Sequence, residues 1–193
     1  MIPKILEEVF GIESLVFGKI EPSARIFVYL HGAGEFGKGC EGQYQYPGFA
    51  RLLRDDEILL NQPFVIACCL KGEYWSPEDL KSYLSELTKY FGKSEIDLIG
   101  YSRGGLGVYE YLHYGGQVKT ATVINSRVPN NWSMCHDIPM HIIHAVEDQN
   151  TSIDSVLKFT ESLKSRFSMT VFDGDHFSIE AIAKSQKWLR CID

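Results

Sequence analysis

The sequence predicts an α/β fold in which a mostly parallel sheet of about seven strands is covered by helices on both faces. Two observations lead to this prediction. Short apolar runs alternate with segments of helical spacing along the 193 residues, and the run at residues 64–70 is continuously apolar, as a strand buried on both faces is. No repeat, low-complexity tract or linker divides the chain. We therefore expect one domain over residues 1–193.

The expected elements follow each other in a simple order. Two early strands, which could form a hairpin, are separated by a turn at residues 21–23. The expected strands are at residues 14–20, 24–30, 64–70, 95–101, 120–126, 140–146 and 169–173. The expected helices are at residues 77–91, 103–114, 152–166 and 178–189. The helix at 77–91 has the clearest start, because Ser76 is a favourable N-cap and Pro77 suits the first turn.

Composition and charge exclude several classes of function. The formal net charge is −6 and lysine and arginine do not cluster, which argues against nucleic-acid binding. No apolar run is long enough to span a bilayer, and residues 1–11 lack the apolar core of a secretory signal. The cysteines are odd in number and do not match zinc-site spacing: Cys40, Cys68, Cys69, Cys135 and Cys191. A reduced, cytoplasmic protein without a metal or other cofactor is expected.

Ser102 is the most informative residue. It lies in the run Gly-Tyr-Ser-Arg-Gly-Gly at residues 100–105, between an expected strand and an expected helix. A G-x-S-x-G motif in this position predicts a nucleophile elbow, a turn so sharp that residues two positions from the serine must be small. The positive end of the following helix favours negative charge that develops near the hydroxyl.

A serine hydroxyl needs a base, and His176 is the best candidate for it. His176 follows the expected strand 169–173, and its place near the end of the chain fits the order Ser…Asp…His that this type of site has. Asp148, just after strand 140–146, is expected to orient the imidazole. Glu147 and Asp154 remain rivals for the acid, whereas Asp175 is disfavoured because adjacent side chains point apart.

A glycine-rich turn after strand 24–30 predicts an oxyanion hole. The sequence there is His-Gly-Ala-Gly-Glu at residues 31–35. The backbone N–H groups of Ala33 and of Arg103, the residue after the nucleophile, are the expected donors. The small residue Gly34 would let the main chain approach the substrate, and His31 is expected to hold the loop rather than carry a proton.

Other side chains are weaker candidates for binding substrate. Trp75, Tyr44 and Tyr46 could line an acyl or alcohol pocket, although aromatic residues more often belong to the core. Arg103 is unusual as a cation in a first helical turn. It could pair with Glu35 or Asp148, or attract an anionic group of the substrate.

These motifs resemble the α/β-hydrolase superfamily, and within it the phospholipase/carboxylesterase-like branch of predicted esterases related to dienelactone hydrolase. The resemblance is carried by Tyr-Leu-His-Gly-Ala-Gly-Glu at residues 29–35 and by the elbow region 96–107. It implies triad roles for Ser102, Asp148 and His176, oxyanion roles for Ala33 and Arg103, and no cap domain, since the loop 127–139 is short. Three positions depart from the branch: Ala145, Asp175 and Arg103.

The expected function is that of a serine hydrolase acting on a small-molecule carboxylic ester or thioester through an acyl-enzyme on Ser102. Two alternatives remain open. One is a small peptidase or amidase of the same fold, and the other is a non-catalytic ligand-binding protein on a hydrolase scaffold. The sequence has no feature that sets an oligomeric state.

Overall fold

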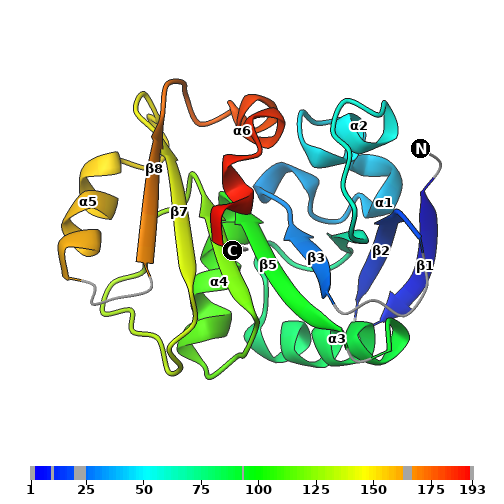
Figure 1. Cartoon of the computed structure of the whole chain (residues 1–193). Coiled ribbons are helices and arrows are strands. Elements are labelled where there is room, and N and C mark those ends of the chain that lie inside the picture. Colours follow the sequence, from blue (N-terminus) through cyan, green and yellow to red (C-terminus); the bar gives the residue numbers. More distant parts are fainter. Residues whose placement is uncertain (1–2, 10, 20–24, 93, 163–166, 192–193) are drawn as a thin grey trace.

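The computed structural model describes residues 3–191 except residues 10, 20–24, 93 and 163–166. Within these residues, eight strands form one sheet in the order β1-β2-β4-β3-β5-β6-β7-β8 (Figure 1). The first two strands are antiparallel to their neighbours and the other pairs are parallel. The strands are β1 (Lys4–Val9), β2 (Ile12–Phe17), β3 (Arg25–Leu30), β4 (Phe64–Cys69), β5 (Glu95–Tyr101), β6 (Thr120–Ile124), β7 (Met140–Ala145) and β8 (Phe167–Phe172).

The mostly parallel sheet of about seven strands is confirmed, with eight strands observed. The strand without a counterpart in the sequence analysis is β1, an edge strand that carries charged residues and lacks a continuous apolar pattern. The early strands β2 and β3 do not form a hairpin, since β4 lies between them. Every residue of β4 is buried, which favours a central position. The expected turn at residues 21–23 lies outside the described residues.

Helices cover both faces of the sheet, as expected (Figure 1). One face packs against Leu80 of α3, Val108 of α4 and Val156 of α5. The other face packs against Phe49 of α2 and Ile182 of α6. The helices are α1 (Gly39–Gly42), α2 (Phe49–Arg54), α3 (Pro77–Tyr90), α4 (Arg103–His113), α5 (Ile153–Ser162) and α6 (Ile179–Ser185), with short 3-10 helices at Ala33–Glu35 and Lys187–Cys191.

The helix starts follow local chemistry. Ser76 caps α3, because its hydroxyl accepts a hydrogen bond from the backbone N–H of Asp79 at 3.2 Å. The sequence predicts one continuous helix at residues 178–189. The structure has two helices there, α6 and a 3-10 helix, and Gln186 between them has a left-handed backbone conformation. Residues 163–166 of the expected helix 152–166 lie outside the described residues.

The carboxyl ends of the parallel strands meet at one edge of the sheet, and the loops that carry the candidate site leave from there. The segment 125–139 between β6 and β7 contains no helix or strand, so it forms no cap over this edge. None of the helices in the described part of the chain is both long and apolar enough to cross a membrane.

The packing of α4 against β3 gives a test of the fold. A Cβ atom at Gly104 would lie 2.0 Å from the carbonyl oxygen of Leu30, and neither backbone can yield easily. We expect Gly104→Ala to lower the free energy of unfolding by about 3 kcal/mol or more, as overpacking of a rigid site does. Urea denaturation measures the change.

Gly34→Ala is the matched control for Gly104→Ala. Its new Cβ would meet only the ring of Tyr46, a side chain, at 3.2 Å. We expect this control to change the free energy of unfolding by less than about 1 kcal/mol. Equal losses in the two variants would contradict the close approach of α4 to β3.

Candidate active site

Ser102 occupies a strained turn between β5 and α4. Its backbone angles are φ 53° and ψ −112°, in a region that L-residues rarely adopt. A Cβ atom at Gly100 would lie 2.3 Å from the carbonyl oxygen of Gly104. Both glycines of the motif are therefore required by the turn, as the sequence predicts. The Ser102 N–H donates to the carbonyl of Ile124 at 2.9 Å, which ties the turn to β6.

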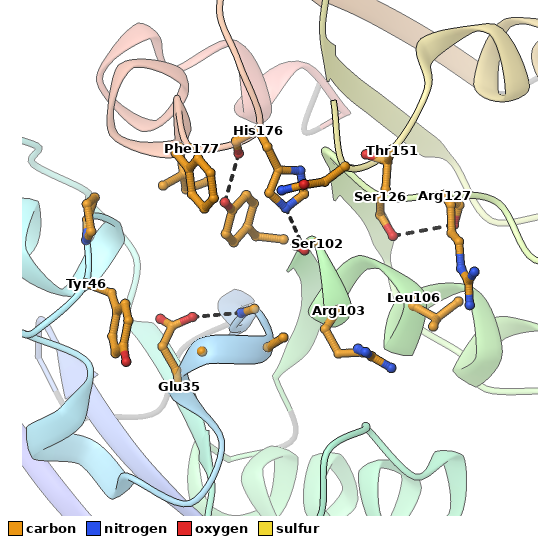
Figure 2. Close-up of a pocket in the computed structure, with 17 residues that line it drawn as sticks. Glu35, Tyr46, Ser102, Arg103, Leu106, Ser126, Arg127, Thr151, His176 and Phe177 are labelled. Atoms are coloured by element: carbon orange, nitrogen blue, oxygen red, sulfur yellow. Dashed lines mark hydrogen bonds between the residues drawn. The ribbon is translucent and has the colours of Figure 1, made fainter. Parts of the chain in front are cut away.

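His176 joins Ser102 to Asp148 through two hydrogen bonds. The hydroxyl of Ser102 lies 2.9 Å from Nε2 of His176, and Nδ1 of His176 lies 2.7 Å from Oδ2 of Asp148. Figure 2 shows the imidazole ring directed at the hydroxyl. The structure thus brings together three residues that lie 74 and 28 positions apart in the sequence.

The Asp148 carboxylate is held by its own loop. The backbone N–H groups of Asn150 and Thr151 both donate to Oδ1 at 2.8 Å, and the hydroxyl of Thr151 donates to Oδ2 at 2.7 Å. Burial raises the pKa of Asp148, but the hydrogen bonds from His176 and Thr151 outweigh it and leave the pKa below its ordinary value. The group is therefore an anion at neutral pH, which suits a partner for an imidazole N–H.

The rival acids face elsewhere. Glu147 and Asp154 are exposed. The Asp175 carboxylate accepts hydrogen bonds from the backbone N–H of Phe177 and the hydroxyl of Ser178, so it caps the turn that precedes α6. Of the four acidic residues considered from the sequence, Asp148 is the one hydrogen-bonded to His176.

His31 supports the turn that follows β3. Its Nε2 accepts a hydrogen bond from the Cys69 N–H at 3.1 Å, so its Nδ1 carries the proton and donates to the Gly32 carbonyl at 2.8 Å. Burial lowers its pKa to about 4, although the bond to Gly32 opposes this. The ring is neutral and fully buried, in agreement with the structural role expected from the sequence.

Ala33 and Arg103 each begin a helix beside Ser102. Ala33 is the first residue of the 3-10 helix Ala33–Glu35, and Arg103 is the first residue of α4. Backbone N–H groups at such positions have no partner inside their helix. Both residues line the cavity that contains Ser102, as Gly34 does.

The cavity around Ser102 has a volume of about 500 Å³, and both polar and apolar residues line it. Figure 2 shows Glu35, Tyr46 and Phe177 on one side of Ser102 and Arg103, Leu106 and Arg127 on the other. Among the described residues, no group of three or more His, Cys, Asp or Glu side chains is arranged to hold a metal ion.

Comparisons with known proteins identify the fold. No protein-family model matches the sequence, and no curated protein sequence matches it. An esterase from Pyrococcus furiosus is 17% identical, with a TM-score of 0.71 over 97% of this chain and 92% of that one. An α/β serine hydrolase homologue from Coxiella burnetii is 16% identical, with a TM-score of 0.70 over 99% and 97% of the two chains. A Xanthomonas campestris α/β serine hydrolase without a lid is 14% identical, with a TM-score of 0.68 over 97% and 93%.

The chain has the α/β-hydrolase fold. Ser102 therefore lies at the position after the central strand β5 where the elbow of this fold is expected. Identities of 14–17% establish the architecture alone, so the chemistry must be argued from this site.

Two aromatic residues expected in the pocket do not line it. Trp75 is 1% exposed, donates its indole N–H to the His31 carbonyl at 3.2 Å, and packs on Gly107 of α4. In this chain the Trp75 side chain therefore braces the turn behind the site. Tyr44 is half-buried against the core on the sheet face that α2 and α6 cover, and the guanidinium of Arg54 lies over its ring. Tyr46, two residues later, does line the cavity.

Asn125 and Tyr101 position the His176 loop, and sequence reasoning missed both. The Asn125 side-chain N–H group donates to the carbonyls of His176 and Asp175 at 3.0 and 3.3 Å, while its oxygen accepts from the Ala145 N–H at 2.8 Å. The Tyr101 hydroxyl donates to the same His176 carbonyl at 2.8 Å. An asparagine at the carboxyl end of β6, beside the loop that carries His176, was the available signal.

Glu35, considered from the sequence as a partner for Arg103, is instead a buried acid of the turn after β3. Its side chain accepts a hydrogen bond from the Gly32 N–H at 2.9 Å and lines the cavity (Figure 2). Burial raises its pKa to about 7, although the bond to Gly32 and the charge of Lys38 oppose this. Glu35 thereby closes the turn that carries Ala33, and the ionisation of Glu35 is linked to the stability of that turn.

Asn125→Ala tests the attachment of the His176 loop. The change removes three hydrogen bonds and leaves the buried Ala145 N–H without its acceptor, while the His176 carbonyl keeps only the Tyr101 hydroxyl as a donor, so we expect the free energy of unfolding to fall by about 3 kcal/mol. Tyr101→Phe removes one donor from a carbonyl that Asn125 still serves, and a loss of about 1 kcal/mol is expected. Chemical denaturation measures both variants. A loss for Tyr101→Phe as large as that for Asn125→Ala would show that Asn125 is not the main attachment.

Glu35→Gln tests the buried acid through pH. The Glu35 carboxyl binds its proton more tightly in the folded protein than in the unfolded chain, so its contribution to stability is lost as pH rises from 4.5 to about 7. The amide of the variant stays neutral throughout. Relative to Glu35→Gln, we expect wild type to lose about 3 kcal/mol of unfolding free energy between about pH 5 and about pH 8. Parallel pH profiles for the two proteins would refute the burial argument.

Proposed function

We propose that the protein is a serine hydrolase that cleaves a carboxylic ester or thioester through an acyl-enzyme on Ser102. The observation that carries the proposal is the continuous chain of hydrogen bonds from the Ser102 hydroxyl through His176 to Asp148, at a strained turn beside free helix N-termini. A merely structural serine would not need such a turn, because strained backbone persists mainly where function requires it.

Acylation begins when the Ser102 oxygen attacks the substrate carbonyl carbon. Nε2 of His176 takes the hydroxyl proton as the new C–O bond forms. The Asp148 carboxylate holds the other ring nitrogen in its protonated form and stabilises the imidazolium cation. The lowered pKa of Asp148 keeps this carboxylate ionised, as both tasks require. In this mechanism the backbone N–H groups of Ala33 and Arg103, two residues that line the cavity, bind the oxyanion of the tetrahedral intermediate.

Collapse of the intermediate breaks the bond to the alcohol or thiol. His176 returns its proton to the departing oxygen or sulfur, and the acyl group remains on Ser102. Water then attacks the acyl-enzyme while Nε2 of His176 takes a proton from it. The second collapse releases the carboxylic acid and restores the Ser102 hydroxyl, so one ester and one water become one acid and one alcohol.

The cavity volume of about 500 Å³ suits a small ester or thioester. The segment between β6 and β7 forms no cap, and similarity to an esterase fold is consistent with this class of substrate. A peptidase or amidase must in addition protonate a poor leaving group. Turnover of an ester, a thioester and an amide with the same acyl group discriminates between these functions.

We also propose that the chain acts as a single domain in the cytoplasm. The thiols of Cys40, Cys68 and Cys69 are free and buried, which fits a reducing compartment. Burial raises the pKa of Cys68 and Cys69, so these thiols are poor nucleophiles and poor metal ligands.

A fluorophosphonate probe tests whether Ser102 is activated. The probe is expected to add one adduct mass to the peptide that carries Ser102 in wild type. His176→Ala should lose the labelling, because the hydroxyl then has no base. Ser102→Ala should lower turnover of a reactive ester by about 10⁶-fold while leaving the fold intact.

The matched control is Ser155→Ala, which changes an exposed serine hydroxyl of α5 that donates to the Ser152 carbonyl, outside the hydrogen-bond chain. It should retain labelling of Ser102. A well-folded wild type that is not labelled would support the non-catalytic binding protein instead, and normal turnover in Ser102→Ala would refute the assignment of the nucleophile.

A further inference from the structure

We propose that Arg103 and Arg127 form a subsite for an anionic group, a carboxylate or a phosphate, on the substrate. This inference rests on the proposed function, because it names the class of ester or thioester that the site would take. The substrate would carry its reacting carbonyl at Ser102 and a negative charge at the end of a short aliphatic chain.

The two arginines come from different elements and meet at one wall of the cavity. Arg103 directly follows Ser102 at the start of α4, and Arg127 follows Ser126 in the loop after β6. Both side chains are exposed and both line the cavity. Figure 2 shows them on the same side of Ser102, with the side chain of Leu106 beside them. An aliphatic chain could lie along Leu106 and reach the guanidinium groups.

Their charges are poorly compensated by the protein. In the part of the chain that the structure describes, neither arginine forms an ion pair with a carboxylate. Glu110 lies close enough to interact with both: burial raises its pKa, and the charges of Arg103 and Arg127 lower it. One half-buried carboxylate thus serves two cations, so this wall keeps an excess of positive charge in a chain of net charge −6.

Stability does not explain the position of Arg103. A cation in the first turn of a helix is disfavoured by the helix dipole, and an acidic or neutral residue would suit α4 better. Neither of the partners considered from the sequence, Glu35 and Asp148, is paired with it: Glu35 accepts from Gly32, and Asp148 accepts from His176 and Thr151. Binding an anion would explain why Arg103 is a cation and why it lines the cavity, because guanidinium groups match carboxylate and phosphate oxygens.

The remaining cavity wall argues for a single anionic end rather than two. On the other side of Ser102 lie Tyr46, Phe177 and the buried Glu35 (Figure 2). A second negative charge there would face Glu35, whose pKa is already raised to about 7 by burial. The half of the substrate on that side is therefore expected to be neutral.

Paired substrates measure the preference directly. The 4-nitrophenyl half-ester of adipate and 4-nitrophenyl hexanoate have acyl chains of equal length and differ in a terminal carboxylate against a methyl group. We define the charge ratio as kcat/KM for the half-ester divided by kcat/KM for the hexanoate. The charge ratio of wild type should exceed one, and Arg127→Gln should lower it about fivefold, the effect of an exposed ion pair. Arg127→Glu should lower it further.

Arg54→Gln is the matched control, since Arg54 is an exposed arginine of α2 that pairs with Asp55 outside the cavity. It should leave the charge ratio unchanged. Competitive inhibition of hexanoate turnover by adipate and by pentyl phosphate separates the two kinds of anion, because the stronger inhibitor identifies the preferred group. A wild-type charge ratio of one or less, or an unchanged ratio in Arg127→Gln, would overturn the subsite.

Failure of the proposed function has a different signature. If Ser102 is neither labelled by the probe nor active on either ester, the hydrolase assignment fails, and calorimetric titration with adipate then decides the subsite. Binding to wild type that is lost in Arg127→Glu would support an anion site in a non-catalytic protein. Equal binding to both proteins, or no binding to wild type, would overturn it.

Discussion

The site depends on one close approach, that of the first turn of α4 to the end of β3. A Cβ atom at Gly104 would lie 2.0 Å from the Leu30 carbonyl oxygen, so the two backbones are in direct contact. This contact sets Ser102, at the start of the helix, relative to Ala33, just beyond the strand. The Ser102 N–H then ties the turn to β6, and the Tyr101 and Asn125 side chains attach the His176 loop to the same region. The rest of the site follows from this packing.

His31 and His176 are both buried at the same edge of the sheet, and their different hydrogen-bond partners give them different roles. His31 uses one ring nitrogen for the Cys69 N–H and the other for the Gly32 carbonyl, and burial keeps it neutral. His176 has a serine hydroxyl on one nitrogen and a carboxylate on the other, so a proton can enter at Nε2 while Nδ1 remains oriented. The same residue type thus serves to hold a turn in one place and is proposed to move a proton in the other.

The sequence predicted the central strands, the helices on both faces and the edge at which the candidate residues gather. It could do so because a buried parallel strand such as β4 is continuously apolar and because Ser102, Asp148 and His176 each follow an expected strand. It missed β1, because this edge strand carries charged residues and has no continuous apolar pattern. It also placed Trp75 in the pocket, since an aromatic side chain that braces a turn has the same local sequence signal as one that binds a ligand.

By itself, the sequence determined the elbow and the order of the three candidate residues, because these depend on local chemistry: two glycines around a strained serine, and polar residues just past apolar runs. Only the tertiary structure decided which acid meets His176, that Asn125 holds the loop of His176, and that Arg103 and Arg127 share one wall of the cavity. These are contacts between loops far apart in the chain, and their distances are set by how the strands pair and the helices pack, which no local pattern records.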